Sequence, residues 1–118
     1  MAKLSLCFVK CDDEIVMINR NNAPFKGLWN ALGGHMEKDE TILECAIREI
    51  YEESHIRVDT AKLISISTWN FDDDEIYVYL SEIKRKDIVV SFPFKNNEGI
   101  IDLKPLNWLV DKDNLGVI

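Results

Sequence analysis

The chain has 118 residues, of which 47% are apolar, and this is enough material for one compact domain with a single core. Its formal net charge of −7 argues against a nucleic-acid polymer as partner, because such polymers normally meet a basic face. Its apolar runs are much shorter than the ~20 residues that cross a bilayer, and no secretory signal is visible at the amino terminus. We therefore expect a single domain over residues 1–118 that resides in the cytoplasm and has no membrane partner.

The first thirty residues predict a β-hairpin followed by a loop. Leu4, Leu6 and Phe8 lie at alternate positions before a polar turn, and an apolar run follows at residues 15–18. Residues 19–29 contain Asn, Pro and Gly without periodicity, which predicts a loop that leads to a short strand near residues 29–32. This loop is a candidate wall of a substrate site.

The middle of the chain predicts one long helix. Thr41 and Glu44 have the spacing of a capping box, and an apolar periodic stretch follows them directly. We place the N-cap at Thr41 and the end of the helix at about Ser54.

The second half of the chain predicts mainly strands. Alternating or β-branched residues predict strands at about 62–69 and 75–83, with a hairpin turn at the acidic run 72–74. Weaker patterns predict strands at 88–92 and 106–110, separated by a polar segment at 95–99. One helix among many strands indicates an α+β domain in which the helix packs on a mixed sheet.

Three glutamates of the predicted helix form the most informative cluster. Glu49, Glu52 and Glu53 stand at i, i+3 and i+4, so their carboxylates share one face of the helix. Like charges at this spacing destabilise a helix, so the cluster needs either free solvent or a cation. The first alternative is a solvated acidic face held by i, i+4 ion pairs. The second is a metal site, since glycines at 33 and 34 let the backbone turn a carbonyl oxygen toward the acids and complete an all-oxygen shell of the kind that Mg²⁺ prefers.

A longer motif favours the metal site. Residues 34–56 resemble the Nudix box, the pattern GX5EX7REUXEEXGU in which U is a bulky apolar residue. Eight of the nine defined positions are met, and the exception is His55, where the family has glycine. A residue other than glycine just after a helix costs roughly 1–2 kcal/mol when it adopts the left-handed conformation, which histidine tolerates comparatively well. The departure therefore concerns the shape of the loop rather than the ligands.

The resemblance implies a Nudix fold, with a mixed sheet in an α/β/α sandwich, and hydrolysis of a nucleoside diphosphate linked to another group. By the family pattern Glu49, Glu52 and Glu53 bind Mg²⁺ or Mn²⁺, and the Gly33 carbonyl adds a ligand. Arg48 orients a glutamate, and Glu40 and Gly34 support the substrate loop. The resemblance therefore implies Mg²⁺ (or Mn²⁺) as the cofactor and Glu49, Arg48 and Glu52 as the catalytic residues.

The chemistry also requires a proton acceptor. Hydrolysis of a P–O–P linkage needs neutralised phosphates and an activated water, and bound cations supply both. A glutamate beside the metal can take the proton; Glu49 is the first choice, and Glu98 in the polar loop 95–99 is the alternative.

The substrate is indicated by residues just before the double glycine. Asn30 lies in the segment Trp-Asn-Ala-Leu-Gly-Gly, which looks like the MutT-like Nudix subgroup that acts on oxidised purine nucleoside triphosphates, and its amide is suited to a base edge. The alternative for Asn30 is a hydrogen bond at a turn or strand end. Similarly, Trp29 and Trp108 are suited either to stacking on a base or to packing in the core.

Other functions stay open on the sequence alone. ADP-ribose and nucleotide sugars are alternative substrates, and a non-catalytic nucleotide-binding or regulatory module is an alternative function. The chain stops at an apolar segment, residues 115–118, where the family usually continues into a second helix. Two explanations are open, a truncated second helix or a partner subunit that covers this face in a homodimer.

Overall fold

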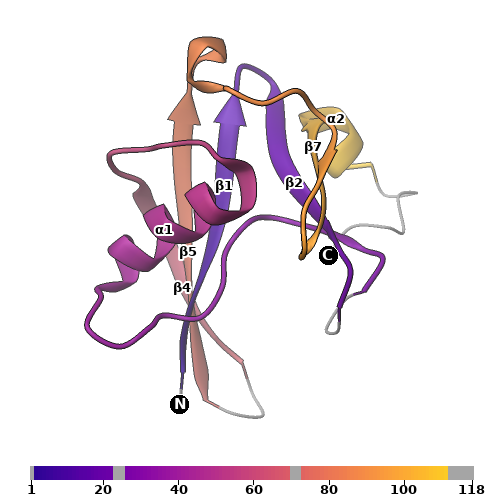
Figure 1. Cartoon of the computed structure of the whole chain (residues 1–118). Helices are drawn as coiled ribbons and strands as arrows, with labels where there is room; N and C mark the ends of the chain where they lie inside the picture. The colour runs from indigo at the N-terminus through magenta and orange to yellow at the C-terminus, as the bar shows by residue number, and fades with distance from the viewer. Residues whose placement is uncertain (1, 23–25, 70–72, 112–118) are drawn as a thin grey trace.

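The computed structural model describes residues 2–22, 26–69 and 73–111, which form a mixed sheet with one long helix (Figure 1). The helices in this part of the chain are α1 (Ile42–Ser54), the 3-10 helix η1 (Arg85–Asp87) and α2 (Leu106–Leu109). The strands are β1 (Lys3–Cys11), β2 (Glu14–Arg20), β3 (Trp29–Asn30), β4 (Lys62–Trp69), β5 (Asp74–Ile83), β6 (Phe94–Lys95) and β7 (Gly99–Pro105).

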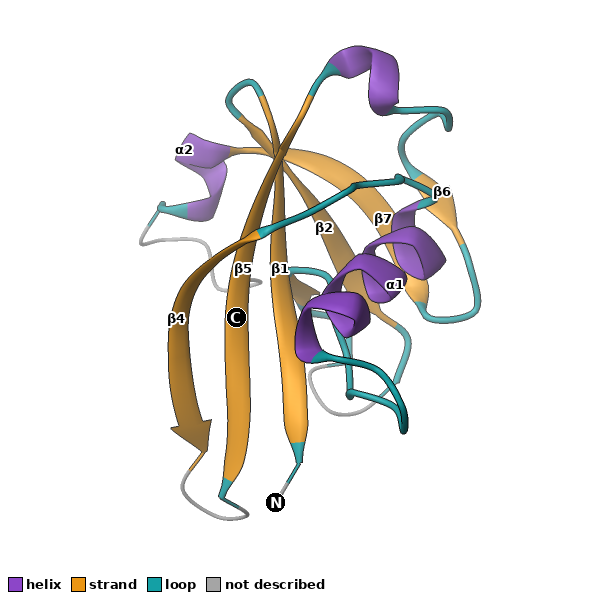
Figure 2. Cartoon of the chain, turned by 90° about the vertical axis from the view of Figure 1, so that its left-hand side faces the viewer, coloured by secondary structure: helices purple, strands orange, loops and turns teal. Residues whose placement is uncertain are grey.

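The sheet is mixed, as the sequence predicts. Its strand order is β4-β5-β1-β2-β7-β6, and β3 pairs with β2 beside this path. β1 and β5 are parallel, whereas the other paired strands are antiparallel. The long helix α1 packs on one side of the sheet, and the four-residue α2 lies on the other side (Figure 2). The α+β class and the layered arrangement are therefore confirmed, with a short second helix.

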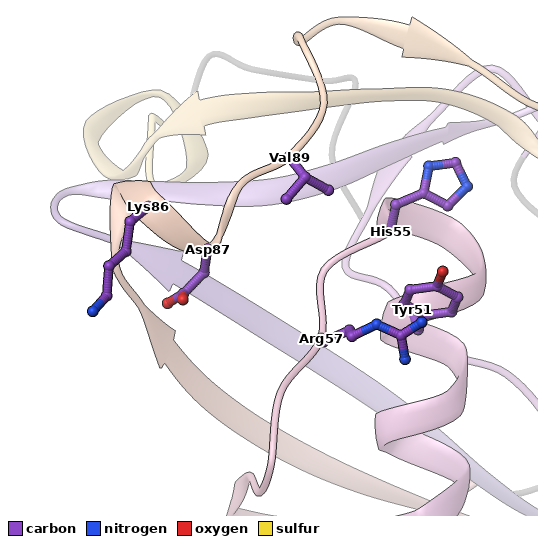
Figure 3. Close-up of a pocket in the computed structure, with 6 residues that line it drawn as sticks. All are labelled: Tyr51, His55, Arg57, Lys86, Asp87 and Val89. Carbon is purple, nitrogen blue, oxygen red and sulfur yellow. The ribbon is translucent and has the colours of Figure 1, made fainter.

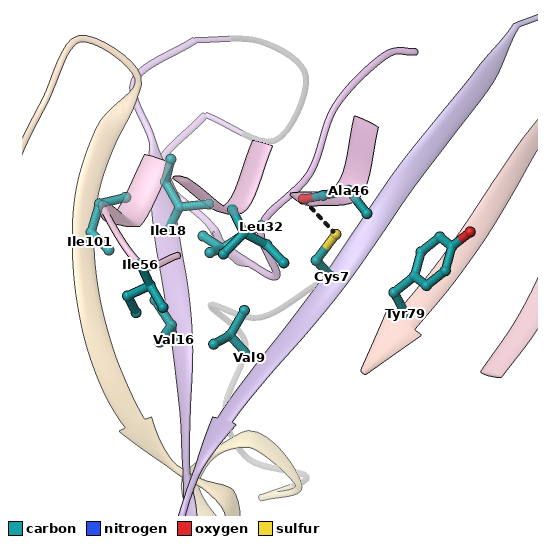
Figure 4. Packing of buried hydrophobic residues seen from close by; sticks show 10 residues of the cluster. Cys7, Val9, Val16, Ile18, Leu32, Ala46, Ile56, Tyr79 and Ile101 are labelled. Atoms are coloured by element: carbon teal, nitrogen blue, oxygen red, sulfur yellow. Dashed lines mark hydrogen bonds between the residues drawn. The ribbon is translucent and has the colours of Figure 1, made fainter. Parts of the chain in front are cut away.

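The core lies between α1 and the sheet. Along β1 the buried residues are Ser5, Cys7, Val9 and Cys11, so the period of two turns this face toward the helix. Cys7 lies against α1, and its Sγ donates to the Ala46 carbonyl at 3.9 Å (Figure 4). Burial raises the pKa of Cys7 to about 12, so it stays a thiol.

The predicted helix is confirmed in both its start and its end. Thr41 is the N-cap, and its side chain accepts from the Glu44 amide while Glu44 accepts from the Thr41 amide. His55 follows the last turn in the left-handed conformation, with φ 61°. Local capping chemistry therefore fixes both ends of α1.

Two of the predicted strands are wrong. Residues 88–92 form no strand: Ile88 and Phe92 pack against the core while Val89 is 75% exposed, so the apolar run serves as a packed connection. Residues 106–110 form α2 instead, because Pro105 has no amide hydrogen for the ladder and ends β7. The strand that occupies this region, β7, begins at Gly99, where the sequence pattern predicts the end of a loop.

Two further expectations involve residues that are not described. The hairpin turn predicted at 72–74 includes Asp72, which lies outside the described residues, although β4 and β5 do pair as antiparallel neighbours. The apolar end at 115–118 also lies outside them. Among the residues that are described, no helix combines the length and the apolar composition of a membrane span.

Candidate active site

Three glutamates from two elements meet at one end of α1. Glu49 and Glu53 lie one turn apart on the helix, and Glu98 comes from the loop between β6 and β7. One carboxylate oxygen of each lies within 4.8 Å of the other two. Glu53 is 2% exposed and the Glu49 side chain is 12% exposed, whereas Glu98 is exposed to solvent. The group therefore has a buried floor and one open side.

Glu53 is the deepest member of this group. Its Oε1 accepts a hydrogen bond of 2.7 Å from the Gly33 amide. Its Oε2 is buried and has no hydrogen-bond partner among the described residues. Burial, with a contribution from the neighbouring carboxylates Glu49 and Glu98, raises the pKa of Glu53 to about 9. Such a group is costly to keep ionised unless a cation or a proton neutralises it.

Glu49 packs directly on the backbone of Gly34. A Cβ built on Gly34 would lie only 2.7 Å from Glu49 Oε1, so a side chain at position 34 would displace the carboxylate. Glu49 Oε1 also accepts from Arg48 Nη1 at 3.0 Å. Burial raises the pKa of Glu49, and Arg48 acts against this effect. Glycine at position 34 thus makes room for the Glu49 carboxylate.

Gly33 and Gly34 are held close to β1. The Ser5 amide donates to the Gly34 carbonyl at 2.8 Å, and the Cys7 amide donates to the Leu32 carbonyl at 2.6 Å. Gly33 has φ +139°, and a Cβ there would lie 2.0 Å from the Ser5 carbonyl oxygen. Only glycine permits this approach, and it brings the Gly33 amide to Glu53.

Arg48 links α1 to the loop that precedes it. Its guanidinium binds both oxygens of Glu40, with Nη2 to Oε1 at 2.8 Å and Nε to Oε2 at 3.0 Å. Nη2 also donates to the His35 carbonyl at 3.2 Å. The hydrogen bonds from Arg48, and then that from the Glu37 amide, lower the pKa of Glu40 to about 2. Arg48 and Glu40 therefore hold the loop and Glu49 in place.

Glu52 lies apart from the group of three. Its side chain is 53% exposed, and its Oε2 accepts from Arg48 Nη1 at 3.2 Å. Of the three glutamates that the helical spacing brings to one face, the structure thus brings two together and adds Glu98 from a distant segment. The contact of Gly33 with the glutamates is made by its amide, whereas the resemblance implies its carbonyl as a metal ligand.

Asn96 is a site residue that the sequence reasoning did not identify. Its Nδ2 donates to the Glu53 carbonyl at 3.1 Å, and its Oδ1 accepts from the amides of Glu98 and Gly99. The only signal in the sequence is the turn-forming segment Asn-Asn-Glu-Gly, which predicts a loop but not its contact with α1.

The candidate base-binding residues are engaged within the protein. Asn30 is 9% exposed, pairs with Ile18 of β2, and its Nδ2 donates to the Leu28 carbonyl at 3.4 Å. The rings of Trp29 and Trp108 meet edge to face, with centroids 6.3 Å apart, and the Lys104 ammonium lies over both. The two tryptophans therefore pack on each other and on Lys104 as half-buried residues outside the buried core.

A separate surface hollow lies near the last turn of α1 (Figure 3). Its lining residues are Tyr51, His55, Arg57, Lys86, Asp87 and Val89. The clustered glutamates are absent from this lining, so the hollow is distinct from the carboxylate site.

Comparison with known proteins agrees with this geometry. The model of the NUDIX domain matches residues 2–111. The chain belongs to the Nudix family. Relatives of this Nudix chain include the phosphatase NudJ of Escherichia coli (strain K12), 35% identical over 63 residues that cover 53% of the chain and 40% of NudJ. Another relative is the NAD-capped RNA hydrolase NudC of Edwardsiella ictaluri, 28% identical over 76 residues that cover 64% of the chain and 30% of NudC.

The solved structures agree on the fold. A NUDIX hydrolase from Nitrosomonas europaea superimposes with a TM-score of 0.76 at 20% identity, covering 90% of this chain and 58% of that one. Among the curated relatives, the matched part of the Nudix chain spans less than half the length of NudJ and of NudC.

Proposed function

We propose that this Nudix domain is a Mg²⁺- or Mn²⁺-dependent hydrolase that cleaves a pyrophosphate linkage in a nucleoside diphosphate derivative. The observation that carries the proposal is the Glu53 Oε2 atom, which is buried without a hydrogen-bond partner among the described residues and belongs to a group of three carboxylates. A buried carboxylate oxygen of this kind is suited to a cation, since buried polar groups are normally paired.

The residues present fit a hard divalent cation. Glu49, Glu53 and Glu98 offer carboxylate oxygens, the ligand type that Mg²⁺ and Mn²⁺ prefer. A cation would also replace the proton that burial otherwise keeps on Glu53. Glu52 is a less direct ligand in this proposal, because Arg48 binds its carboxylate.

The chain's own residues supply orientation and a proton acceptor. A bound divalent cation neutralises phosphate charge and lowers the pKa of a water molecule. Arg48 holds Glu49 at Oε1, and Gly33 holds Glu53 at Oε1, so both carboxylates are oriented before substrate arrives. Of the two candidate bases, Glu98 is better suited than Glu49, because it is exposed at the open side and Arg48 does not bind it among the contacts described.

We take a purine nucleoside triphosphate, oxidised or unmodified, as the substrate, on the basis of Asn30 and the segment around it. The Asn30 Nδ2 atom donates to the Leu28 carbonyl, and a carboxamide can also accept from a base edge through its oxygen. ADP-ribose and nucleotide sugars are the alternative substrates. The two curated relatives carry different names, a phosphatase and an NAD-capped RNA hydrolase, so their names do not select one substrate class.

A turnover screen tests the proposal. Purified protein is incubated with Mg²⁺ or Mn²⁺ and with nucleoside triphosphates, nucleotide sugars, dinucleotides or ADP-ribose, and released phosphate and pyrophosphate are measured. We expect metal-dependent release from one of these classes and a loss of at least about 100-fold in kcat for Glu53→Gln. Glu82→Gln, an exposed residue of β5, is the matched control and should turn over like wild type.

The same screen separates the alternatives. Equal rates for wild type and Glu53→Gln would remove the proposed mechanism. Nucleotide binding by calorimetry without turnover in any class would instead favour a non-catalytic regulatory module. A sedimentation experiment on the same samples tests whether the chain forms a homodimer.

A further inference from the structure

The loop that carries Glu98 is fastened to the end of α1 by two contacts. One is made by Asn96 and the other by His55, the residue that replaces the glycine of the Nudix box. Asn96 belongs to the loop between β6 and β7, whereas His55 is the C-cap of α1.

Asn96 joins the loop to the helix through a single side chain. Its Nδ2 donates to the Glu53 carbonyl at 3.1 Å, and this carbonyl belongs to the last turn of α1. Its Oδ1 accepts from the Glu98 amide at 2.9 Å and from the Gly99 amide at 3.1 Å. The side chain therefore sets the distance between the backbones of Glu53 and Glu98.

His55 makes the second contact with its ring. The ring lies parallel to that of Phe94, with centroids 5.5 Å apart and an interplanar angle of 13°. It also meets the edge of Tyr51 on α1, with centroids 6.1 Å apart. Phe94 starts β6, so this stack holds the beginning of the segment that leads to Glu98. A glycine at position 55 has no ring to make this contact.

These two contacts restrict the movement of the loop that carries Glu98. Glu98 must stay beside Glu49 and Glu53, and these carboxylates repel one another once Glu53 gives up the proton that burial keeps on it. An exposed loop residue would move away from Glu49 and Glu53 unless its backbone were held. We propose that Asn96 and His55 are positioning residues that keep Glu98 at the carboxylate site. This inference rests on the proposed function for its catalytic consequence, but not for the loop geometry.

A double-mutant cycle tests whether Asn96 acts through Glu98. We expect Asn96→Ala to lower kcat by about tenfold or more, the usual effect of removing a residue that orients a metal ligand. In the Glu98→Gln background, the same substitution should lower kcat by less than threefold, because the carboxylate that it positions is already gone. Asn97→Ala, an exposed neighbour in the same loop, is the control and should behave like wild type. Equal losses from Asn96→Ala in both backgrounds would overturn the inference.

Two further measurements do not depend on turnover. The affinity for Mn²⁺ alone, followed by water-proton relaxation, should fall about tenfold in Asn96→Ala and much less in Asn97→Ala. Hydrogen exchange without metal should show faster exchange at the Glu98 and Gly99 amides in Asn96→Ala, with unchanged protection in β1. If wild type binds Mn²⁺ but hydrolyses nothing, the proposed function fails while these measurements still decide the positioning role. Unchanged Mn²⁺ affinity and unchanged amide exchange in Asn96→Ala would reject the positioning role of Asn96.

Two variants at position 55 isolate the ring. His55→Asn and His55→Gly both tolerate the left-handed conformation, and both remove the stack on Phe94. We expect both to speed exchange at the Glu98 amide and to weaken Mn²⁺ binding several-fold, even where His55→Gly stabilises the helix end. Wild-type Mn²⁺ affinity and exchange in both variants would show that His55 has no part in positioning Glu98.

Discussion

The folded state and the proposed reaction place opposite demands on Glu53. The metal-free protein favours the protonated carboxyl, because burial and two neighbouring carboxylates raise the pKa of Glu53 to about 9. A metal site needs the ionised form. Stability without metal and affinity for metal should therefore respond in opposite directions to changes at this one residue.

The pH dependence of stability follows from this pKa. In the unfolded chain Glu53 titrates near 4.5, so between about pH 4.5 and pH 9 the folded protein holds a proton that the unfolded chain has lost. The stability of metal-free protein should fall as the pH rises through this window, by at most about 1.4 kcal/mol per pH unit. Glu53→Gln removes this titration and should melt at a higher temperature than wild type at pH 8 in EDTA. Thermal melts at pH 5, 6.5 and 8 measure the effect, and parallel curves for the two proteins would contradict it.

The two adjacent glycines should respond differently to alanine. In Gly34→Ala the new Cβ meets the end of the Glu49 side chain, which can move, so the fold should persist while Mg²⁺ affinity falls about tenfold or more. In Gly33→Ala the Cβ meets the Ser5 backbone and φ is positive, so the main effect should be a loss of several kcal/mol of stability. Urea unfolding and a Mg²⁺ titration on each variant separate the two effects. Similar unfolding midpoints for both variants would refute this distinction.

At the scale of elements, α1 shows what local sequence can specify. Thr41 and Glu44 predict the start of the helix from hydrogen bonds within four residues, and the structure confirms both this start and the end at Ser54. The helical spacing of Glu49, Glu52 and Glu53 predicts a shared face, and the structure brings Glu49 and Glu53 together while Glu52 lies apart. From the sequence, Glu98 was predicted only as a candidate base and not as a neighbour of Glu53. Its position beside Glu53 depends on the contact of Asn96 with α1 and on the pairing of β6 with β7. Periodicity within one segment carries no information on such contacts.

Arg48 connects α1 to its preceding loop by geometry as well as charge. Arg48→Lys keeps the positive charge but loses the paired hydrogen bonds to Glu40, so we expect a loss of about 1–3 kcal/mol in the free energy of unfolding. The loss should shrink below pH 4.5, because the pKa of Glu40 is about 2 when folded and near 4.5 when unfolded, and its stabilising effect disappears as the pH falls through that interval. Urea unfolding at pH 7 and pH 3 measures both values. Equal losses at the two pH values would show that the Glu40 contact is not the cause.

At the scale of the whole molecule, the sheet topology could not be predicted from the sequence. The parallel pairing of β1 with β5 joins segments about seventy residues apart, and it places β1 at the centre of the sheet beneath α1. The β1–β2 hairpin, by contrast, is local and was predicted correctly. The strands 88–92 and 106–110 were wrong because an apolar run next to proline fits a packed connection or a helical turn as well as a strand.

The net charge of −7 should repel an anionic nucleotide as it approaches the protein. Attraction is then expected only close to the cations bound at the proposed site. With saturating Mg²⁺, kcat/KM should therefore stay level or rise between 50 and 200 mM KCl, as salt screens the repulsion. Glu82→Lys changes the net charge of the chain from −7 to −5. The substituted residue lies on the sheet face away from α1, because Glu82 pairs with Lys10, which faces away from the helix. It should raise kcat/KM by up to about threefold at low salt, with kcat unchanged, and the difference should vanish at 0.5 M KCl, where the Debye length is only about 4 Å. A steep fall of wild-type kcat/KM with salt would instead reveal a cationic path for the substrate that outweighs the charge of the whole domain.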